Sequence, residues 1–157
     1  MCVYLKQMNK KVFESFYEKS IVDYANEHVK SGDWEAEGST ERARSEFETL
    51  LPEGLDTSNQ YLLSAIYNNV EIGYVWLHIY DGKDQKKCFI YDINIKDAYR
   101  GQGLGTKTMR SIEEYCKDTD VETIGLHVFG HNKRAVALYN KMGFETTNYR
   151  MEKKLKW

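Results

Sequence analysis

The sequence of 157 residues suits one domain with a buried core, and 41% hydrophobic and 29% charged residues are ordinary for a globular protein. The net charge of -2 argues against a nucleic-acid-binding domain, which is usually basic. No signal-peptide core and no run of membrane-spanning length are present, so we expect a cytoplasmic protein. The three cysteines lack metal-ligand spacing, which predicts reduced thiols and no metal site.

The first third of the chain predicts a short strand and two helices. Residues 3–8 suit the strand, and Asn9 is a candidate helix cap. Aromatic and aliphatic residues then recur at helical spacing between Phe13 and His28, which predicts an amphipathic helix ending at 31–33. A start signal and a following proline bound a second helix at about 39–51.

The middle of the chain predicts three strands. Residues 60–67 and 72–80 are rich in branched and aromatic residues, and they are separated by an Asn-Asn turn. The sequence Asp-Gly-Lys-Asp at 81–84 is typical of a hairpin turn, and it leads into a third strand at 87–95.

The last third alternates between helices and strands. A glycine-rich loop at 100–105 leads into a helix that ends near Thr119, and a strand at 123–128 follows. Residues 132–142 predict another helix, and 144–155 predict a final strand or hairpin. A helix that joins two successive strands favours a parallel pair within a mixed sheet.

The glycine-rich loop is the main candidate for ligand binding. Its glycines permit positive φ and close backbone approach, and the helix that follows offers unpaired N–H groups and a positive dipole end. Together these features favour a phosphate-bearing ligand. Thr106 stands where the dinucleotide fingerprint needs glycine, and the Gly-Lys-Ser/Thr of a P-loop is absent, which argues against a nucleotide-dependent kinase. The alternative is a plain helix-entry turn.

The spacing that fits is Arg-x-x-Gly-x-Gly, with Arg100, Gly103 and Gly105. This run resembles the pyrophosphate-binding signature of the GNAT acetyltransferase superfamily. The sequence Asn-x-x-Ala-x-x-Leu-Tyr-x-Lys-x-Gly-Phe at 132–144 resembles the second motif of that family, and the two motifs stand in the right order, about thirty residues apart. The likeness includes bacterial acetyltransferases of the family.

The resemblance implies an α/β (α+β) fold of the GNAT type. Its central mixed, twisted sheet would have about six to seven strands and about four flanking helices, with a splayed parallel strand pair forming the cofactor cleft. We expect a single acetyltransferase domain over 1–157. Residues 60–157 would be the acetyl-coenzyme A-binding core, and residues 1–59 the variable part on the substrate side.

The resemblance also implies the activity, which is transfer of the acetyl group of acetyl-coenzyme A to a primary amine of a small molecule or peptide, by direct attack in a ternary complex. The charge, the cysteine spacing and the hydropathy of the chain predict no nucleic-acid, metal or membrane partner, and a homodimer is allowed. The alternative is a non-catalytic acyl-coenzyme A sensor of the same fold. The implied cofactor contacts are Ile93, Asn94, Ile95, Arg100, Gly101, Gln102, Gly103, Leu104, Gly105, Thr106, Asn132 and Lys141.

Two residues are candidate catalytic groups by the same resemblance. Tyr139 stands where the family has a general acid for the departing thiolate, since a phenol is protonated at neutral pH. Asp92 stands on the strand that often carries a general base, and burial would have to raise its pKa. Their alternatives are an aromatic core residue and a buried structural aspartate, and Tyr91 could relay a proton instead.

Several candidate residues also have structural interpretations. Ile93 and Ile95 could pack in the core, Asn132 could cap a helix, and Lys141 could be a solvent-exposed cation. The four histidines have no telling partners and predict structural roles. The aromatic face of the first helix, Trp34 and the acidic stretch 33–37 could line the amine side. Such an aromatic stripe is more often core, however, and a solvated loop is the favoured interpretation of the acidic stretch.

Overall fold

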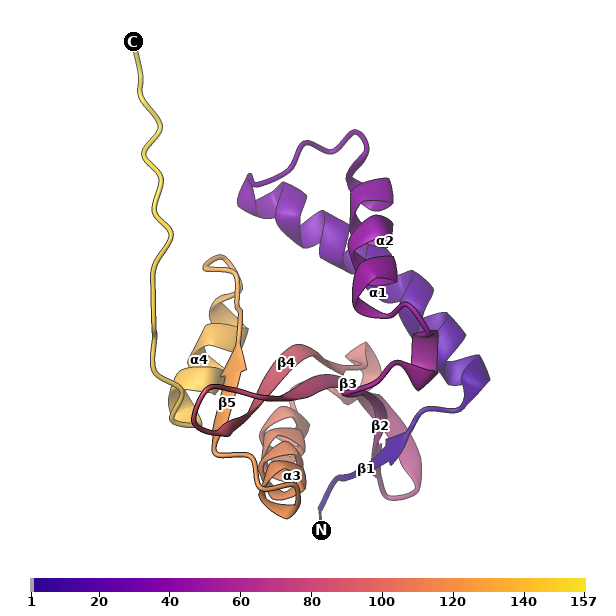
Figure 1. Cartoon of the computed structure of the whole chain (residues 1–157). Helices are drawn as coiled ribbons and strands as arrows, with labels where there is room; N and C mark the ends of the chain where they lie inside the picture. Colours follow the sequence, from indigo (N-terminus) through magenta and orange to yellow (C-terminus); the bar gives the residue numbers. More distant parts are fainter. Residues whose placement is uncertain (1) are drawn as a thin grey trace.

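The computed structural model describes residues 2–157, as five strands, four α-helices and two short 3₁₀ turns (Figure 1). Two helices follow the first strand, three strands follow those helices, and helices and strands then alternate. The elements are β1 Tyr4–Gln7, α1 Lys10–Ser31, α2 Ser39–Leu50, η1 Gly54–Asp56, β2 Gln60–Tyr67, β3 Val70–Asp81, β4 Lys86–Ile95, η2 Asp97–Tyr99, α3 Leu104–Asp118, β5 Thr123–Leu126 and α4 Lys133–Lys141.

The strands form one mixed sheet in the order β1-β2-β3-β4-β5. The first four are antiparallel neighbours, and β5 joins β4 in parallel after the crossover through α3. This parallel pair was predicted from the alternation of helix and strand. The expected mixed α/β architecture with four helices is therefore confirmed.

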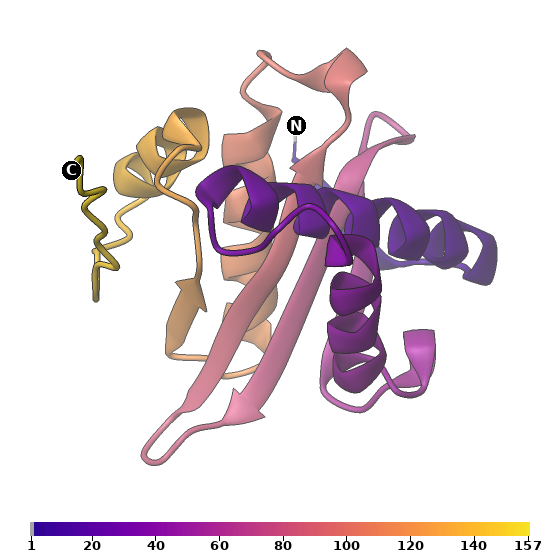
Figure 2. The same ribbon diagram turned by 90° about the horizontal axis from the view of Figure 1, so that it is seen from above.

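The two faces of the sheet pack against different helices (Figure 2). Neighbouring residues of one strand alternate between them, as the period of two requires. Leu62 and Trp76 belong to a core with α1 and α2, whereas Leu63 and Val75 belong to a core with α3. Among the described residues, no helix is long and apolar enough to cross a membrane.

The ends of α1 follow from local sequence. The side chain of Asn9 accepts a hydrogen bond from the Val12 amide at 2.8 Å, which satisfies one of the unpaired donors at the helix start. Gly32 ends the helix in the left-handed conformation, and its amide bonds back into the last turn. The start and the end of α1 were therefore predicted correctly from these residues.

The predicted strand or hairpin at 144–155 is wrong for this structure, and so is the expected count of six to seven strands. Residues 145–157 form neither helix nor strand, and every one of them is exposed. A strand is stabilised by pairing with a neighbour, and in this part of the chain no neighbouring strand is present. The strand β5 is also shorter than the predicted 123–128.

Gly73 sets the spacing between β3 and β4, because a Cβ there would lie 2.1 Å from the Asn94 carbonyl oxygen. Gly73→Ala should therefore lower the free energy of unfolding by roughly 1–3 kcal/mol, the cost of overpacking a tight site. Gly130→Ala is the control, since nothing lies within 4 Å of its Cβ position. Urea denaturation of both variants tests this, and equal midpoints would contradict it.

Candidate active site

A bulge in β4 decides which way its acidic residue faces. Trp76 of β3 pairs with Asp92, but the next residue, Leu77, pairs with Ile90, so Tyr91 is the extra residue. Cys88 and Ile90 pack on the α3 side of the sheet. Without the bulge Asp92 would share that face.

The same point is where β4 and β5 separate. Their parallel pairing runs from Lys87 with Thr123 to Ile90 with Leu126 and ends there. From Tyr91 to Ile95, β4 pairs only with β3 among the described strands. Its other edge is therefore without strand pairing over the predicted cofactor-contact residues.

The glycine-rich loop has the backbone shape expected of it. Gly101 and Gly103 have φ of 77° and 75°, a left-handed conformation that other residues adopt only with strain, and open space surrounds their Cβ positions. Gly103 caps α3 without any side-chain hydrogen bond to the helix start. The first amides of α3 therefore point toward an open loop, an arrangement suited to an anion.

The residues around these glycines hold the loop in place. The Nε atom of Arg100 donates to the carbonyl of Ile95 at 2.8 Å, and its guanidinium pairs with Asp97 at 3.1 Å. Leu104 is buried, Gln102 is exposed and Thr106 is half-buried in the first helical turn. The Arg100 side chain thus fixes the loop to the end of β4, and its contact with a phosphate stays a prediction.

Asp92 has the electrostatics of a candidate base. Burial raises the pKa of its carboxyl group to about 7, with a further increase from Asp23. Lys19 and the amide of Ile93 act in the opposite direction and lower the pKa. Because Asp23 and Lys19 belong to α1, the carboxylate faces that helix.

Tyr139 lies on α4, half-buried, with its ring 5.7 Å from that of Phe144. Burial raises the pKa of its hydroxyl to about 12, and the nearby carboxylate of Asp92 adds to the increase. The start of α3 is close to the same helix, because a Cβ at Gly105 would contact Leu138 at 3.5 Å. The structure thus brings the two candidate catalytic residues and the glycine-rich loop together.

The other predicted contacts lie around them. Asn132 caps α4, since its side chain accepts from the Ala135 amide at 3.3 Å. The helix-capping role considered for Asn132 is therefore observed. Lys141 is exposed in the last turn of α4, and Asn94 is half-buried opposite Tyr74. Ile93 packs against the core on the α3 side and Ile95 against a smaller core beside β1.

Comparison with known proteins agrees with this geometry. The sequence model described as the Acetyltransferase (GNAT) family matches residues 16–144. The chain belongs to the GNAT acetyltransferase family. It is similar to the uncharacterised N-acetyltransferase YdgE of Bacillus subtilis, with 35% identity over 99% of both chains.

Two further GNAT relatives bear on the interpretation. The crystal structure of YycN from Bacillus subtilis superposes with a TM-score of 0.95 at 32% identity, over 99% of both chains. The thialysine N-epsilon-acetyltransferase of Sus scrofa is 34% identical over 73 residues, which are 46% of this chain and 43% of that one.

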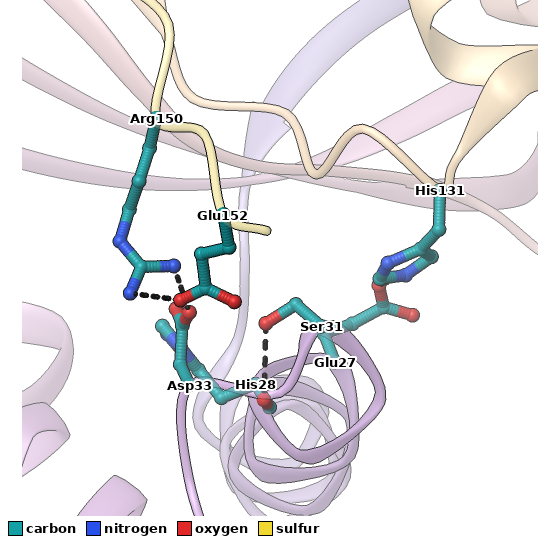
Figure 3. A network of polar contacts seen from close by, with 7 residues as sticks. All are labelled: Glu27, His28, Ser31, Asp33, His131, Arg150 and Glu152. Atoms are coloured by element: carbon teal, nitrogen blue, oxygen red, sulfur yellow. Dashed lines mark hydrogen bonds and ion pairs between the residues drawn. The ribbon is translucent and has the colours of Figure 1, made fainter. Parts of the chain in front are cut away.

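Polar contacts link the end of α1 to the loop before α4 and to the C-terminal segment of this GNAT chain (Figure 3). Trp34 is buried and its ring stacks on His28 at 4.1 Å, so it belongs to the core. His28 also contacts Asp33 at 3.1 Å, and His131 contacts Glu27 at 2.6 Å, which links the loop before α4 to α1. Across residues 2–157, no group of three or more His, Cys, Asp or Glu side chains could hold a metal ion.

Sequence reasoning missed the part that α1 plays. The charges of Lys19 and Asp23 act on Asp92, and these two side chains form an ion pair at 2.8 Å. Their spacing of four residues predicts a surface pair on a helix and says nothing about the strand that the helix covers. Glu46 of α2 was missed as well, although one of its carboxylate oxygens is buried without a hydrogen-bond partner.

The raised pKa of Asp92 gives a pH dependence to stability. Between the unfolded value near 3.8 and the folded value of about 7, the native state holds a proton that the unfolded chain releases. Stability therefore falls as pH rises through this window. From pH 5 to pH 8, wild type should lose up to about 3 kcal/mol relative to Asp92→Asn, since one pKa unit corresponds to about 1.4 kcal/mol.

Denaturant unfolding at both pH values measures this difference. Asp118→Asn, an exposed aspartate at the end of α3, is the control and should follow wild type. Parallel pH profiles for wild type and Asp92→Asn would show that Asp92 is ionised at pH 5 in the folded chain.

Proposed function

We propose that this chain transfers the acetyl group of acetyl-coenzyme A to a primary amine by direct attack. The observation that carries the proposal is the convergence of Asp92, Tyr139 and the glycine-rich loop where the pairing of β4 and β5 ends. Each group has a distinct task in a thioester aminolysis, which needs an anchored donor, a base for the amine and an acid for the thiolate. Membership of the GNAT family supports the same reaction.

The donor would bind across two elements. Its pyrophosphate would lie on the loop at 100–106, where the left-handed glycines and the first amides of α3 favour negative charge. Its pantetheine arm would run along the edge of β4 at 93–95 that β5 leaves unpaired, as an extended chain added to a strand does. Asn132 and Lys141 would complete the contacts from either end of α4.

The amine would arrive from the side of α1. A primary amine is mostly protonated at neutral pH, and it must lose a proton to attack the thioester carbonyl carbon. A carboxylate whose pKa is about 7 can accept that proton far better than an ordinary aspartate. The pig relative is named for acetylation of the side-chain amine of thialysine, which supports a primary amine as acceptor.

The carbon–sulfur bond then breaks, and the thiolate would take the proton of Tyr139. The resulting phenolate would recover a proton from the nitrogen, which after the attack carries one proton more than the amide product. With Asp92 ionised, the pKa of this phenol is about 12 and the group stays protonated. Once Asp92 has accepted the amine proton, its contribution to that pKa disappears, and the phenol becomes a better acid. Accepting the first proton thus promotes donation of the second.

Acetyl-coenzyme A should raise the melting temperature of the wild-type chain. A ligand at 100 times its dissociation constant adds about 2.7 kcal/mol to the free energy of unfolding. Gly103→Asp should abolish the shift, because it puts a carboxylate into the anion site. Thermal melting with and without millimolar acetyl-coenzyme A is the measurement.

Gly38→Asp is a matched control. Gly38 also precedes a helix, has a φ of 77° and has open space at its Cβ position, so the backbone strain of the substitution should be similar. This variant should melt lower than wild type and still respond to acetyl-coenzyme A. Loss of the response in both variants, or in neither, would count against a phosphate site at Gly103.

Tyr139→Phe tests the chemical step. It keeps the ring and its packing on Phe144, so the variant should fold and bind acetyl-coenzyme A nearly as wild type does. Its kcat should fall at least about tenfold, since general acid catalysis contributes roughly 10²–10⁴-fold. Coenzyme A release with a panel of primary amines gives the rates.

Tyr115→Phe is the control, because Tyr115 is a half-buried tyrosine of the same core whose pKa is also raised by burial. It should turn over at the wild-type rate. Wild-type kcat in Tyr139→Phe would assign the phenol to packing, and no coenzyme A release by wild type with any amine would overturn the proposed activity.

A further inference from the structure

Four aromatic side chains form a shelf on the face of the sheet that α1 and α2 cover elsewhere. The shelf consists of His78 and Tyr80 of β3 together with Phe89 and Tyr91 of β4. The ring centroids of His78 and Tyr80 are stacked at 4.9 Å, and those of Phe89 and Tyr91 also lie 4.9 Å apart. The two pairs meet where the His78 ring lies 6.2 Å from the Tyr91 ring. The four rings therefore form one continuous surface.

The shelf is open to solvent. Figure 2 shows the hairpin end of β3 and β4 extending beyond α1 and α2. Tyr80 is 36% and Tyr91 37% exposed, and the other two rings are half-buried. Exposed aromatic side chains that gather on one face of a domain mark a binding surface. The alternate residues of the same strands face α3 instead and are all buried, namely Leu77, Ile79, Cys88 and Ile90.

The shelf begins at the candidate base. Tyr91 is the bulged residue immediately before Asp92, and its ring centroid lies 4.7 Å from that of Trp76. Trp76 is the residue that pairs with Asp92, and it belongs to the core beneath α1 and α2. The shelf and the Asp92 carboxylate are therefore on the same face of the sheet. An amine whose nitrogen lies at Asp92 would have the rest of its atoms beside Tyr91.

The neighbours of the shelf favour a flat, uncharged group. Lys87 pairs with Tyr80, so its side chain lies on the same face, where its charge would repel a second ammonium group. Gly125 of β5 leaves one edge of the Phe89 ring bare, since a Cβ at that glycine would lie 3.7 Å from the ring. Aromatic rings pack favourably on other rings, either offset-stacked or edge to face. An aromatic ring therefore suits this surface better than a cation does.

We propose that the acceptor is a primary amine that carries an aromatic ring, and that this ring packs on the shelf while the nitrogen lies at Asp92. The inference rests on the proposed acetyl transfer, to which it adds the class of substrate. Phe89 and His78 would contact the substrate away from the reacting atoms. Such contacts are equally strong before and during the reaction, so they lower KM and leave kcat unchanged.

Three matched amines test the preference of the wild-type chain. Coenzyme A release gives kcat/KM for 2-phenylethylamine, 2-cyclohexylethylamine and propylamine. The value for 2-phenylethylamine should exceed that for propylamine by at least about tenfold, because the added ring is buried and packs on other rings. It should also exceed the value for 2-cyclohexylethylamine, which is as apolar but has no flat ring. Equal values for the phenyl compound and either of the others would overturn the proposal.

Phe89→Leu removes one ring from the shelf and keeps an apolar side chain. It should raise KM for 2-phenylethylamine about two- to tenfold, the contribution of one aromatic pair, and leave the constants for propylamine unchanged. His78→Leu tests the same shelf from β3 and should have the same effect. Tyr4→Leu is the control, because Tyr4 is 53% exposed on β1 at the far edge of the sheet. Wild-type preference in both shelf variants would assign these rings to the surface of the fold alone.

Binding without turnover separates this inference from the proposed function. Calorimetric titration of 2-phenylethylamine into the chain saturated with coenzyme A measures affinity in the absence of reaction. Binding that weakens in Phe89→Leu and not in Tyr4→Leu would support the shelf whether or not the amine is acetylated. Turnover of propylamine without any preference for the aromatic amine would overturn the shelf and keep the acetyl transfer. Absence of both binding and turnover would overturn both.

Discussion

The site depends on where β4 stops pairing with β5. Up to Ile90 the two strands share hydrogen bonds, and one residue later the bulge at Tyr91 turns the following side chains over. One irregularity therefore does two things, because it leaves an edge of β4 unpaired and it moves Asp92 from the α3 face to the α1 face. A regular strand would have directed this carboxylate into the apolar core beside Cys88, where no partner could offset its desolvation.

The electrostatics of Asp92 and Tyr139 follow from that geometry. Desolvation is the main cause of both raised pKa values, and it favours the neutral form of each group. The electrostatic interaction between Asp92 and Tyr139 also makes the protonation state of each group depend on that of the other. A more exposed arrangement would weaken both effects, since water would screen the charges. The half-buried position of Tyr139 on α4 therefore has an electrostatic consequence beyond packing.

Local signals in the sequence predicted much of this structure. Asn9 and Gly32 bound α1 through their own conformational preferences, and Gly101 and Gly103 mark a loop that needs positive φ. The bulge at Tyr91 could not be predicted, because the alternation of residue types in β4 is compatible with either register. The sequence also did not show that Lys19 and Asp23 of α1 lie near Asp92. Helix periodicity identifies the apolar face of a helix, but it does not say which strand residues lie opposite its charged side chains.

The C-terminal segment, residues 145–157, shows a different limit of sequence reasoning. Its apolar and polar residues alternate as in a strand, and a strand was predicted there from the sequence. A strand forms, however, only where a second strand supplies hydrogen bonds. The alternation of residue types therefore shows that a segment is able to form a strand. Whether the strand forms depends on an unpaired strand edge being available beside it.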